Sequence, residues 1–209
     1  VLARSGDWQL NPDQNSGNAA VAYRVHCALL DLCAASREHF ALLSVPERWD
    51  AARLAAHTTA LRQRAAADIE TSQATSFAAL HHPWLLRREA ASDGSDSPAA
   101  LAGELHAHPP EGAVLGVYAQ RSRKRGAWAA AGLDPLAEAV ALVGMIDAEG
   151  IESAGVNPIE MRPGGISATR AATLWNVDPD WQAIGVRRLF ILLRRLARRE
   201  GERYTFEPN

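Results

Sequence analysis

The sequence predicts an α/β protein in which a mixed sheet is flanked by helices. Segments with helix-forming patterns alternate with short apolar segments of strand character along most of the chain. The chain has 209 residues and is 47% hydrophobic, which suffices for one substantial core or two small ones. No internal repeat is visible, so nothing indicates a repeat architecture.

The chain is predicted to begin with a loop and to continue as a layered core. Residues 1–19 are rich in turn formers and lack hydrophobic periodicity, so we expect a loop or a cut N-terminal edge there, and an α/β core over residues 20–209. Val21–Leu32 has the pattern of a helix. His39–Val45 has the pattern of a buried strand.

Helix and strand then alternate up to a polar segment. Glu47–Asp68 contains strong helix formers and neither glycine nor proline, so it predicts a helix. Ser76–Arg88 is predicted to be a strand. The polar, turn-rich residues near 91–100 predict a flexible segment.

The second half continues the same alternation. A helix is expected from Pro109 to about Arg125 and an apolar segment over Leu136–Met145. Asp147–Ala154 predicts a short helix that ends at Gly155. Ile159–Thr173 predicts two short strands.

The last predicted element is a long helix that ends near Arg199. Asp178-Pro-Asp180 is expected to cap its start. At ~100° per residue, six arginines share an arc of roughly 140°, which Ile191 interrupts. The residues that fall opposite are apolar, namely Leu189, Phe190, Leu193, Leu196 and Ala197. We expect the apolar side to pack on the sheet and the arginines to meet carboxylates of another subunit or of a tube, although a solvated charged face is an equal alternative. These arginines are Arg187, Arg188, Arg194, Arg195, Arg198 and Arg199.

Several other residues are predicted to fix the backbone or anchor loops. Pro109, Pro110 and Gly112 are expected to fix the start of a helix, and Gly116 would let another backbone approach closely. A plain capped core helix explains these residues equally well. The pair Pro163-Gly164 predicts a turn between two strands. Core anchoring is the role expected of three tryptophans, namely Trp128, Trp175 and Trp181.

Charge and hydropathy exclude some classes of protein. The net charge of −2 gives no long-range attraction to nucleic acid or anionic lipid. No apolar run approaches the roughly 20 residues of a spanning helix, and no signal peptide pattern begins the chain, so we expect synthesis in the cytoplasm and no direct membrane insertion. Cys27 and Cys33 are predicted to be small buried residues rather than a disulfide.

Five stretches together resemble the contractile phage tail sheath family, which has a subtilisin-like sheath domain. Each is weak alone, but their order and spacing are specific. They are Ala79-Leu-His-His-Pro-Trp-Leu85, Pro109-Pro-Glu-Gly-Ala-Val-Leu-Gly-Val-Tyr-Ala119 with Arg125-Gly-Ala-Trp128, Asn157-Pro-Ile-Glu-Met-Arg-Pro-Gly-Gly-Ile166, Thr173-Leu-Trp175, and Asp178 through Ile191 with Phe206-Glu-Pro-Asn209.

The resemblance implies a structural subunit with a sheath-type core domain. Such subunits form stacked sixfold rings around an inner tube, and the sheath contracts to drive the tube through a target envelope. The implied partners are other sheath subunits, the inner tube protein, and baseplate and terminal cap proteins. The subunit would be assembled in the cytoplasm as part of a phage tail or injection particle, some of which are released from the cell. The alternative is a non-contractile cap, terminator or baseplate component that shares this domain.

The sequence departs from the family pattern in a few places. The family pattern starts before Val1 and continues beyond Asn209, so the expected chain is an excerpt without terminal arms, or a shorter paralogue. His81 and His82 stand where aromatic residues are expected, and Gly185 stands where a polar residue is expected.

Catalysis, metal binding and nucleic-acid binding are all disfavoured. The chain has no Gly-x-Ser-x-Gly and none of the glycine-flanked motifs of subtilisins, so we expect no enzyme activity. Four histidines, His81, His82, His106 and His108, lack the cysteine or carboxylate spacing of a ligand set. No known nucleic-acid motif or phosphate loop is present, and no cofactor is expected.

Overall fold

The structure, a computed structural model, confirms the α/β class. It describes residues 16–67, 72–88, 105–129, 134–144 and 147–204. The predicted flexible segment near 91–100 and the closing Phe206-Glu-Pro-Asn209 lie outside the described residues. The element order is α1 (Ser16–Ser36), β1 (Ala41–Leu43), α2 (Ala51–Ala66), a 3-10 turn η1 (Ala74–Phe77), β2 (Ala78–His82), β3 (Leu85–Arg88), β4 (Leu105–His108), α4 (Glu111–Arg125), β5 (Ala139–Leu142), α5 (Ala148–Ser153), β6 (Asn157–Arg162), β7 (Gly165–Ala168) and α6 (Ile184–Tyr204).

The main sheet is mixed and has the strand order β1-β2-β6-β7. β1, β2 and β6 are parallel, and β7 turns back antiparallel to β6 through Pro163-Gly164. The central strand β2 is buried along its whole length, which is typical of a strand with helices on both faces of its sheet. A second, antiparallel sheet has the order β4-β3-β5.

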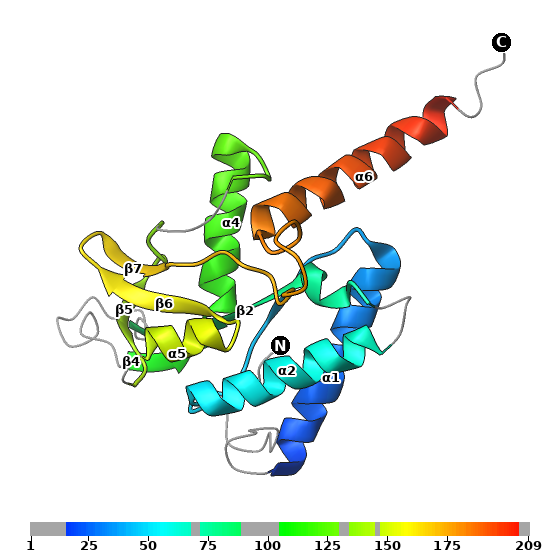
Figure 1. The fold of residues 1–209 in the computed structure, drawn as a ribbon. Coiled ribbons are helices and arrows are strands. Elements are labelled where there is room, and N and C mark those ends of the chain that lie inside the picture. Colours follow the sequence, from blue (N-terminus) through cyan, green and yellow to red (C-terminus); the bar gives the residue numbers. More distant parts are fainter. Residues whose placement is uncertain (1–15, 68–71, 89–104, 130–133, 145–146, 205–209) are drawn as a thin grey trace, which may run out of the picture.

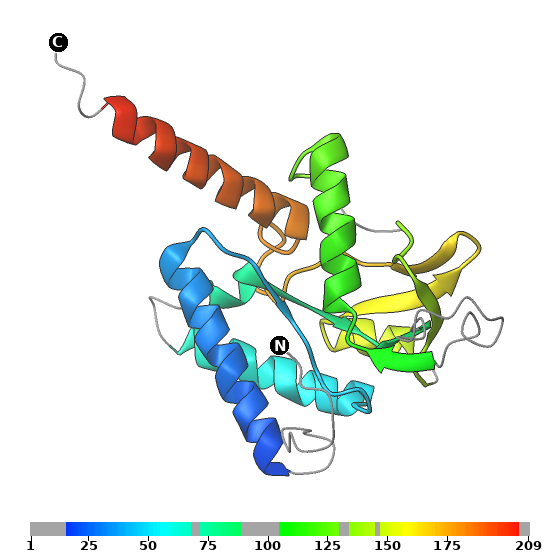
Figure 2. The ribbon, with the colours of Figure 1, turned by 180° about the vertical axis from the view of Figure 1, so that it is seen from behind.

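Two hydrophobic clusters lie on opposite faces of the main sheet. On one face, Leu80 packs with residues of α1, α2 and α5, including Leu30 and Leu54. On the other face, Ala79 packs with α4 and with Leu85 of the second sheet. The alternation of Ala79 and Leu80 between clusters follows the two-residue period of a strand. Figures 1 and 2 show α1 and α2 on one side of the sheet and α4 on the other.

Most predicted elements are confirmed, with shifted bounds. α1 begins at Ser16, inside the range predicted as a loop. Asp147 caps α5 by accepting a hydrogen bond from the Gly150 N–H at 2.9 Å. Gly126 ends α4 with a φ of 101°, which favours glycine because a Cβ would be strained there. Cys27 and Cys33 are buried free thiols, as predicted.

The single strand predicted over Ser76–Arg88 is wrong. The chain instead makes η1, then β2, and then β3 in a different sheet. Pro83 separates the two strands because it has no N–H to continue a ladder. The Trp84 indole N–H then donates to the Val45 carbonyl at 2.8 Å, which ties the corner to β1.

The predicted cap of the last helix is also wrong. α6 begins at Ile184, after the Asp178-Pro-Asp180 segment, and continues to Tyr204 rather than Arg199. Asp178 accepts instead from the Trp175 indole N–H at 3.1 Å and from the Asp180 backbone N–H at 3.0 Å. The aspartate therefore stabilises a local turn before the helix, a common use of this side chain.

By length and composition alone, Ala19–Ser36 of α1 is the one window in the described helices that could cross a membrane. Cys27, Leu30, Cys33 and Ala34 of this window lie in the hydrophobic core. Only 28% of the window is buried, and Val25, Leu29 and Leu32 are exposed, so one side of α1 packs in the core and the other side is exposed.

Two histidines meet in the interface between α1 and α2. Nδ1 of His26 lies 2.9 Å from Nε2 of His57, and the Trp49 ring packs edge-on against His57 with 5.1 Å between centroids. Burial lowers the pKa of both imidazoles, and the neighbouring His26 lowers that of His57 further, to about 4. Both histidines are therefore neutral in the folded protein at neutral pH.

We predict that stability falls as the pH drops from about 6.5 toward 4. In this window His57 takes up a proton in the unfolded chain but not in the folded chain. The free energy of unfolding therefore falls, by on the order of 3 kcal/mol once the pH is below both pKa values. Urea unfolding at several pH values measures this. The variant His57→Phe keeps an aromatic ring beside Trp49 but should show a shallower pH dependence; an unchanged slope would show that His57 does not titrate in this way.

Candidate functional site

The first turn of α6 is fixed to the body by a buried arginine. Arg187 is 5% exposed, and its guanidinium carbon lies 4.1 Å from the Phe77 ring centroid and 3.8 Å from that of Trp181. Its Nη2 donates to Ser76 Oγ. Burial lowers the pKa of Arg187 to about 10, with a smaller contribution from Arg37, and the group still carries its charge at neutral pH. Arg187 is thus engaged within the subunit.

The next arginine ties α6 to α4. The Arg188 guanidinium lies over the Tyr118 ring, 5.1 Å from its centroid, and Nη2 donates to Ser122 Oγ. Burial lowers the pKa of Arg188, although the Tyr118 hydroxyl opposes that effect. These contacts place the helix start between η1 and α4, as Figure 1 shows.

The outer half of α6 extends away from the body (Figures 1 and 2). Arg194, Arg195, Arg198 and Arg199 of this half are exposed. Arg198 pairs with Glu38 at 3.0 Å, and Arg199 pairs with Glu200 at 2.8 Å. The structure therefore divides the six predicted arginines into two inner anchors and four outer cations.

The orientation of α6 is the reverse of the predicted one. The predicted packing side, which includes Phe190, Leu193 and Ala197, is exposed. The side that faces the body carries Arg187 and Arg188. The physical reason is that η1, Trp181 and α4 offer aromatic rings and hydroxyls to the guanidinium groups, and these stack on and hydrogen-bond to them.

The exposed side of α6 forms what we call the outer apolar stripe. It consists of Val186, Phe190, Leu193 and Ala197, which recur at helical spacing. Phe190 is 51% exposed and Leu193 is 50% exposed. The ring of Phe190 packs edge-on against Trp181 at 4.9 Å between centroids. A contiguous exposed stripe of this kind is typical of a surface that binds another protein.

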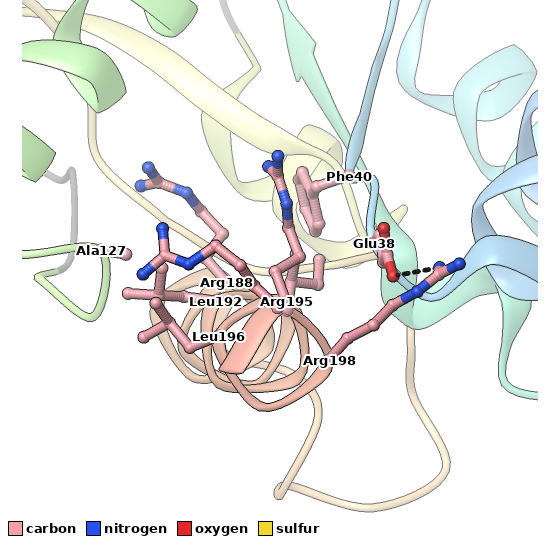
Figure 3. A pocket seen from close by; sticks show the side chains of 10 residues that line it. Glu38, Phe40, Ala127, Arg188, Leu192, Arg195, Leu196 and Arg198 are labelled. Atoms are coloured by element: carbon pink, nitrogen blue, oxygen red, sulfur yellow. Dashed lines mark hydrogen bonds and ion pairs between the residues drawn. The ribbon is translucent and has the colours of Figure 1, made fainter. Parts of the chain in front are cut away.

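The body-facing side of α6 borders a hollow of about 610 Å³, which we call the arginine cleft. It lies between α6, the residues just before β1, and the turn after α4 (Figure 3). Glu38 contributes the one carboxylate of its lining, and four arginines contribute cations. The remaining lining is apolar and comes from Phe40, Ala127, Ile191, Leu192 and Leu196.

The glycines of α4 face a second hollow. A Cβ at Gly112 or Gly116 would meet no described atom within 4 Å. The hollow is also lined by Pro109 of the helix entry and by Arg87 and Glu138 of the second sheet. Pro110 occupies the N-cap position of α4 without a side-chain hydrogen bond, so the two prolines mark the start of the helix, as predicted. The close approach of another backbone to Gly116 stays a prediction.

The three tryptophans do not share one role. Trp175 and Trp181 are half-buried and hold the turn before α6. Trp128 is 58% exposed, so its predicted role as a core anchor is wrong. Its indole lies over Gly126, where a Cβ would collide with the ring. The absence of a side chain at Gly126 lets the ring lie against the end of α4.

The histidines considered as metal ligands are separated. His81 is fully buried at the end of β2, and its Nε2 lies 3.4 Å from the Tyr118 hydroxyl. His82 is also buried, whereas His106 lies on β4 and is exposed. Within the part of the chain that the structure describes, no three His, Cys, Asp or Glu side chains are grouped closely enough to hold a metal ion.

We predict that Arg187→Ala destabilises the fold far more than Arg194→Ala. The first change removes two ring contacts and a charge-assisted hydrogen bond, which we expect to cost about 2–4 kcal/mol. Arg194 is exposed, so its removal should cost less than about 0.5 kcal/mol. Equal unfolding midpoints for the two variants in urea would contradict the anchoring role of Arg187.

Comparisons with known proteins place the fold. No protein-family model matches the sequence, and a search of curated proteins also finds no match. Among solved structures, a chain of the anti-feeding prophage (AFP) baseplate in its contracted state matches 96% of this chain with a TM-score of 0.69 and 22% identity. A chain of the PVC sheath complex, from an extracellular contractile injection system in its contracted state, matches 81% with a TM-score of 0.60 and 25% identity.

A third match is a chain of the AFP helical sheath in its contracted state, with a TM-score of 0.52, 22% identity and 88% of this chain covered. The present chain spans 48%, 42% and 52% of those three chains, respectively. All three belong to contractile injection particles. The α/β fold described here is therefore the fold of a portion of sheath and baseplate proteins from such particles.

Proposed function

We propose that the chain is a structural subunit of a contractile injection particle and forms part of its sheath. In this role it would assemble into stacked hexameric rings around an inner tube and contract to drive the tube through a target envelope. The observation that carries the proposal is the fold likeness over most of the chain, together with 25% identity to a chain of a PVC sheath complex. The resemblance of five sequence stretches to sheath proteins supports it independently.

The surfaces of α6 suit such a role. An isolated subunit leaves the outer apolar stripe in water, and burying it against a neighbour would release that apolar area from water. The outer arginines, Arg194, Arg195, Arg198 and Arg199, are placed to contact another subunit or the tube. Polar contacts of this kind set the register between subunits and exchange partners when an assembly rearranges.

A baseplate component is the second candidate. The observation that favours it is the TM-score of 0.69 with a chain of the contracted AFP baseplate, over 96% of the present chain. A subunit of this kind, or a cap or terminator, would share the domain without contracting. Its partners would be baseplate or terminal cap proteins, and it would occur once per particle end rather than along the whole tube.

Electron microscopy of the protein co-expressed with a tube protein from the same locus tests the proposal. We expect hollow sleeves or stacked sixfold rings. Single rings confined to tube ends would support the baseplate candidate instead. A stable monomer that leaves the tube bare would contradict both.

We also predict that Leu193→Asp combined with Ala197→Asp blocks assembly while the fold is retained. Two carboxylates in the outer apolar stripe would be buried without partners at a subunit contact. Met161→Asp combined with Leu115→Asp is the matched control, because both side chains are exposed and lie outside α6. Circular dichroism checks the fold and sedimentation checks assembly; normal assembly of the α6 variant would show that the stripe is not an interface.

A further inference from the structure

The arginine cleft has an unbalanced set of charges. Arg188, Arg195, Arg198 and Arg199 line it, and Glu38 is the only carboxylate among its lining residues. With the Glu200 carboxylate that pairs with Arg199 included, four positive charges face two negative ones among the described residues, which leaves a net charge of +2. Three of these arginines, Arg195, Arg198 and Arg199, are exposed, so the attraction for an anion comes from their number and proximity and is weakened by salt.

The arginines of the cleft differ in the contacts that they already make within the subunit. Arg188 is used by Tyr118 and Ser122 inside the subunit, and Arg198 is held by Glu38. Arg195 forms no ion pair with any carboxylate among the described residues, and its guanidinium points across the cleft toward Phe40 (Figure 3). Arg195 and Arg194 both lower the pKa of Glu38, after the larger effect of Arg198. Glu38 thus pairs with Arg198 and lies within the electrostatic influence of Arg195.

The apolar part of the cleft restricts the type of anion that fits. Phe40, Ile191 and Leu192 line the same hollow as the arginines. A phosphate or a nucleic-acid backbone would leave these surfaces in contact with water. A peptide with carboxylates on either side of an apolar side chain would satisfy both parts, because guanidinium groups pair with carboxylates and the apolar side chain covers the floor.

We propose that the arginine cleft binds an acidic segment of a partner protein, in which carboxylates flank an apolar side chain, and that Glu38 occupies the cleft in its absence. This proposal rests on the proposed function in naming how the subunit holds a partner. Pairing two copies through their α6 helices would bring arginines against arginines, so charge favours an acidic partner over self-association. Glu38 then acts as an internal competitor that the incoming carboxylate displaces from Arg198.

Fluorescence anisotropy with a labelled peptide, acetyl-Glu-Leu-Glu-Phe-Glu-amide, tests the proposal on the intact chain without any assembled particle. We expect saturable binding that weakens with salt. The peptide acetyl-Glu-Gly-Glu-Gly-Glu-amide should bind several-fold more weakly because it cannot cover the apolar floor. Absence of saturable binding, or equal binding of both peptides, would overturn the proposal.

Variants locate the site. Arg195→Glu with Arg199→Glu should weaken peptide binding at least tenfold, whereas Arg24→Glu with Arg123→Glu, which changes the net charge equally outside the cleft, should change it less than twofold. Glu38→Gln should tighten binding several-fold, since it removes the carboxylate that competes with the peptide for Arg198. Equal losses in the two double variants, or no gain in Glu38→Gln, would contradict the proposal, as would complete competition by inorganic phosphate or a single-stranded oligonucleotide.

The result is separable from the proposed function. A chain that binds the peptide but forms no sleeves or rings keeps the cleft and loses the sheath role. If the wild type does not bind the peptide and the Arg195→Glu, Arg199→Glu variant assembles normally, the sheath proposal stands and the cleft proposal is wrong. Circular dichroism of each variant confirms that exposed arginines were changed without unfolding the chain.

Discussion

A guanidinium group held between two aromatic rings determines how the last helix leaves the body. Arg187 lies between Phe77, which ends η1, and Trp181, which belongs to the turn before α6. Removing an arginine from water is unfavourable, as its lowered pKa shows. The ring contacts and the hydrogen bond to Ser76 offset that cost, and each ring contact is worth on the order of 2 kcal/mol in a site that excludes water. The position of the whole helix follows from this contact.

Once its first turns are fixed, the outer half of α6 needs little support to remain helical. Nucleation is the unfavourable step in helix formation, and the packed turns at Ile184 and Arg187 supply the nucleus. The following residues extend it with strong helix formers such as leucine and arginine. A helix that projects in this way has two free sides, so one sequence presents an apolar stripe outward and an arginine cleft inward.

Sequence patterns predicted the elements of this fold better than their assembly. The hairpin at Pro163-Gly164, the start of α4 after two prolines and the end of α5 at Gly155 depend on neighbouring residues, so local rules found them. The helical period of α6 separated the arginines from Phe190, Leu193 and Ala197, although Ile191 and Leu192 line the cleft beside the arginines. It could not show which group faces the body, because that depends on Phe77, which lies 110 residues earlier in the chain.

The cleft could not be predicted for the same reason. Its lining comes from the segment before β1, the turn after α4 and the body-facing side of α6, which only the tertiary fold brings together. Glu38 in particular carries no sequence signal, since an isolated glutamate after a helix is common on protein surfaces. Likewise, the residue type of Trp128 favours burial, but its indole is 58% exposed and contacts Gly126 at the end of α4, a contact that the sequence pattern does not indicate.

The two free sides of α6 place different demands on an assembly that changes shape. An apolar contact loses its stabilisation whenever it separates, since the stripe then returns to water. Carboxylates bound in the arginine cleft can be replaced by Glu38 or by water. This replacement costs much less free energy than exposing the stripe, because ion pairs at an exposed surface contribute little net stability. In the proposed role, we therefore expect the stripe to stay covered throughout contraction and the cleft to be the contact that is released and formed again.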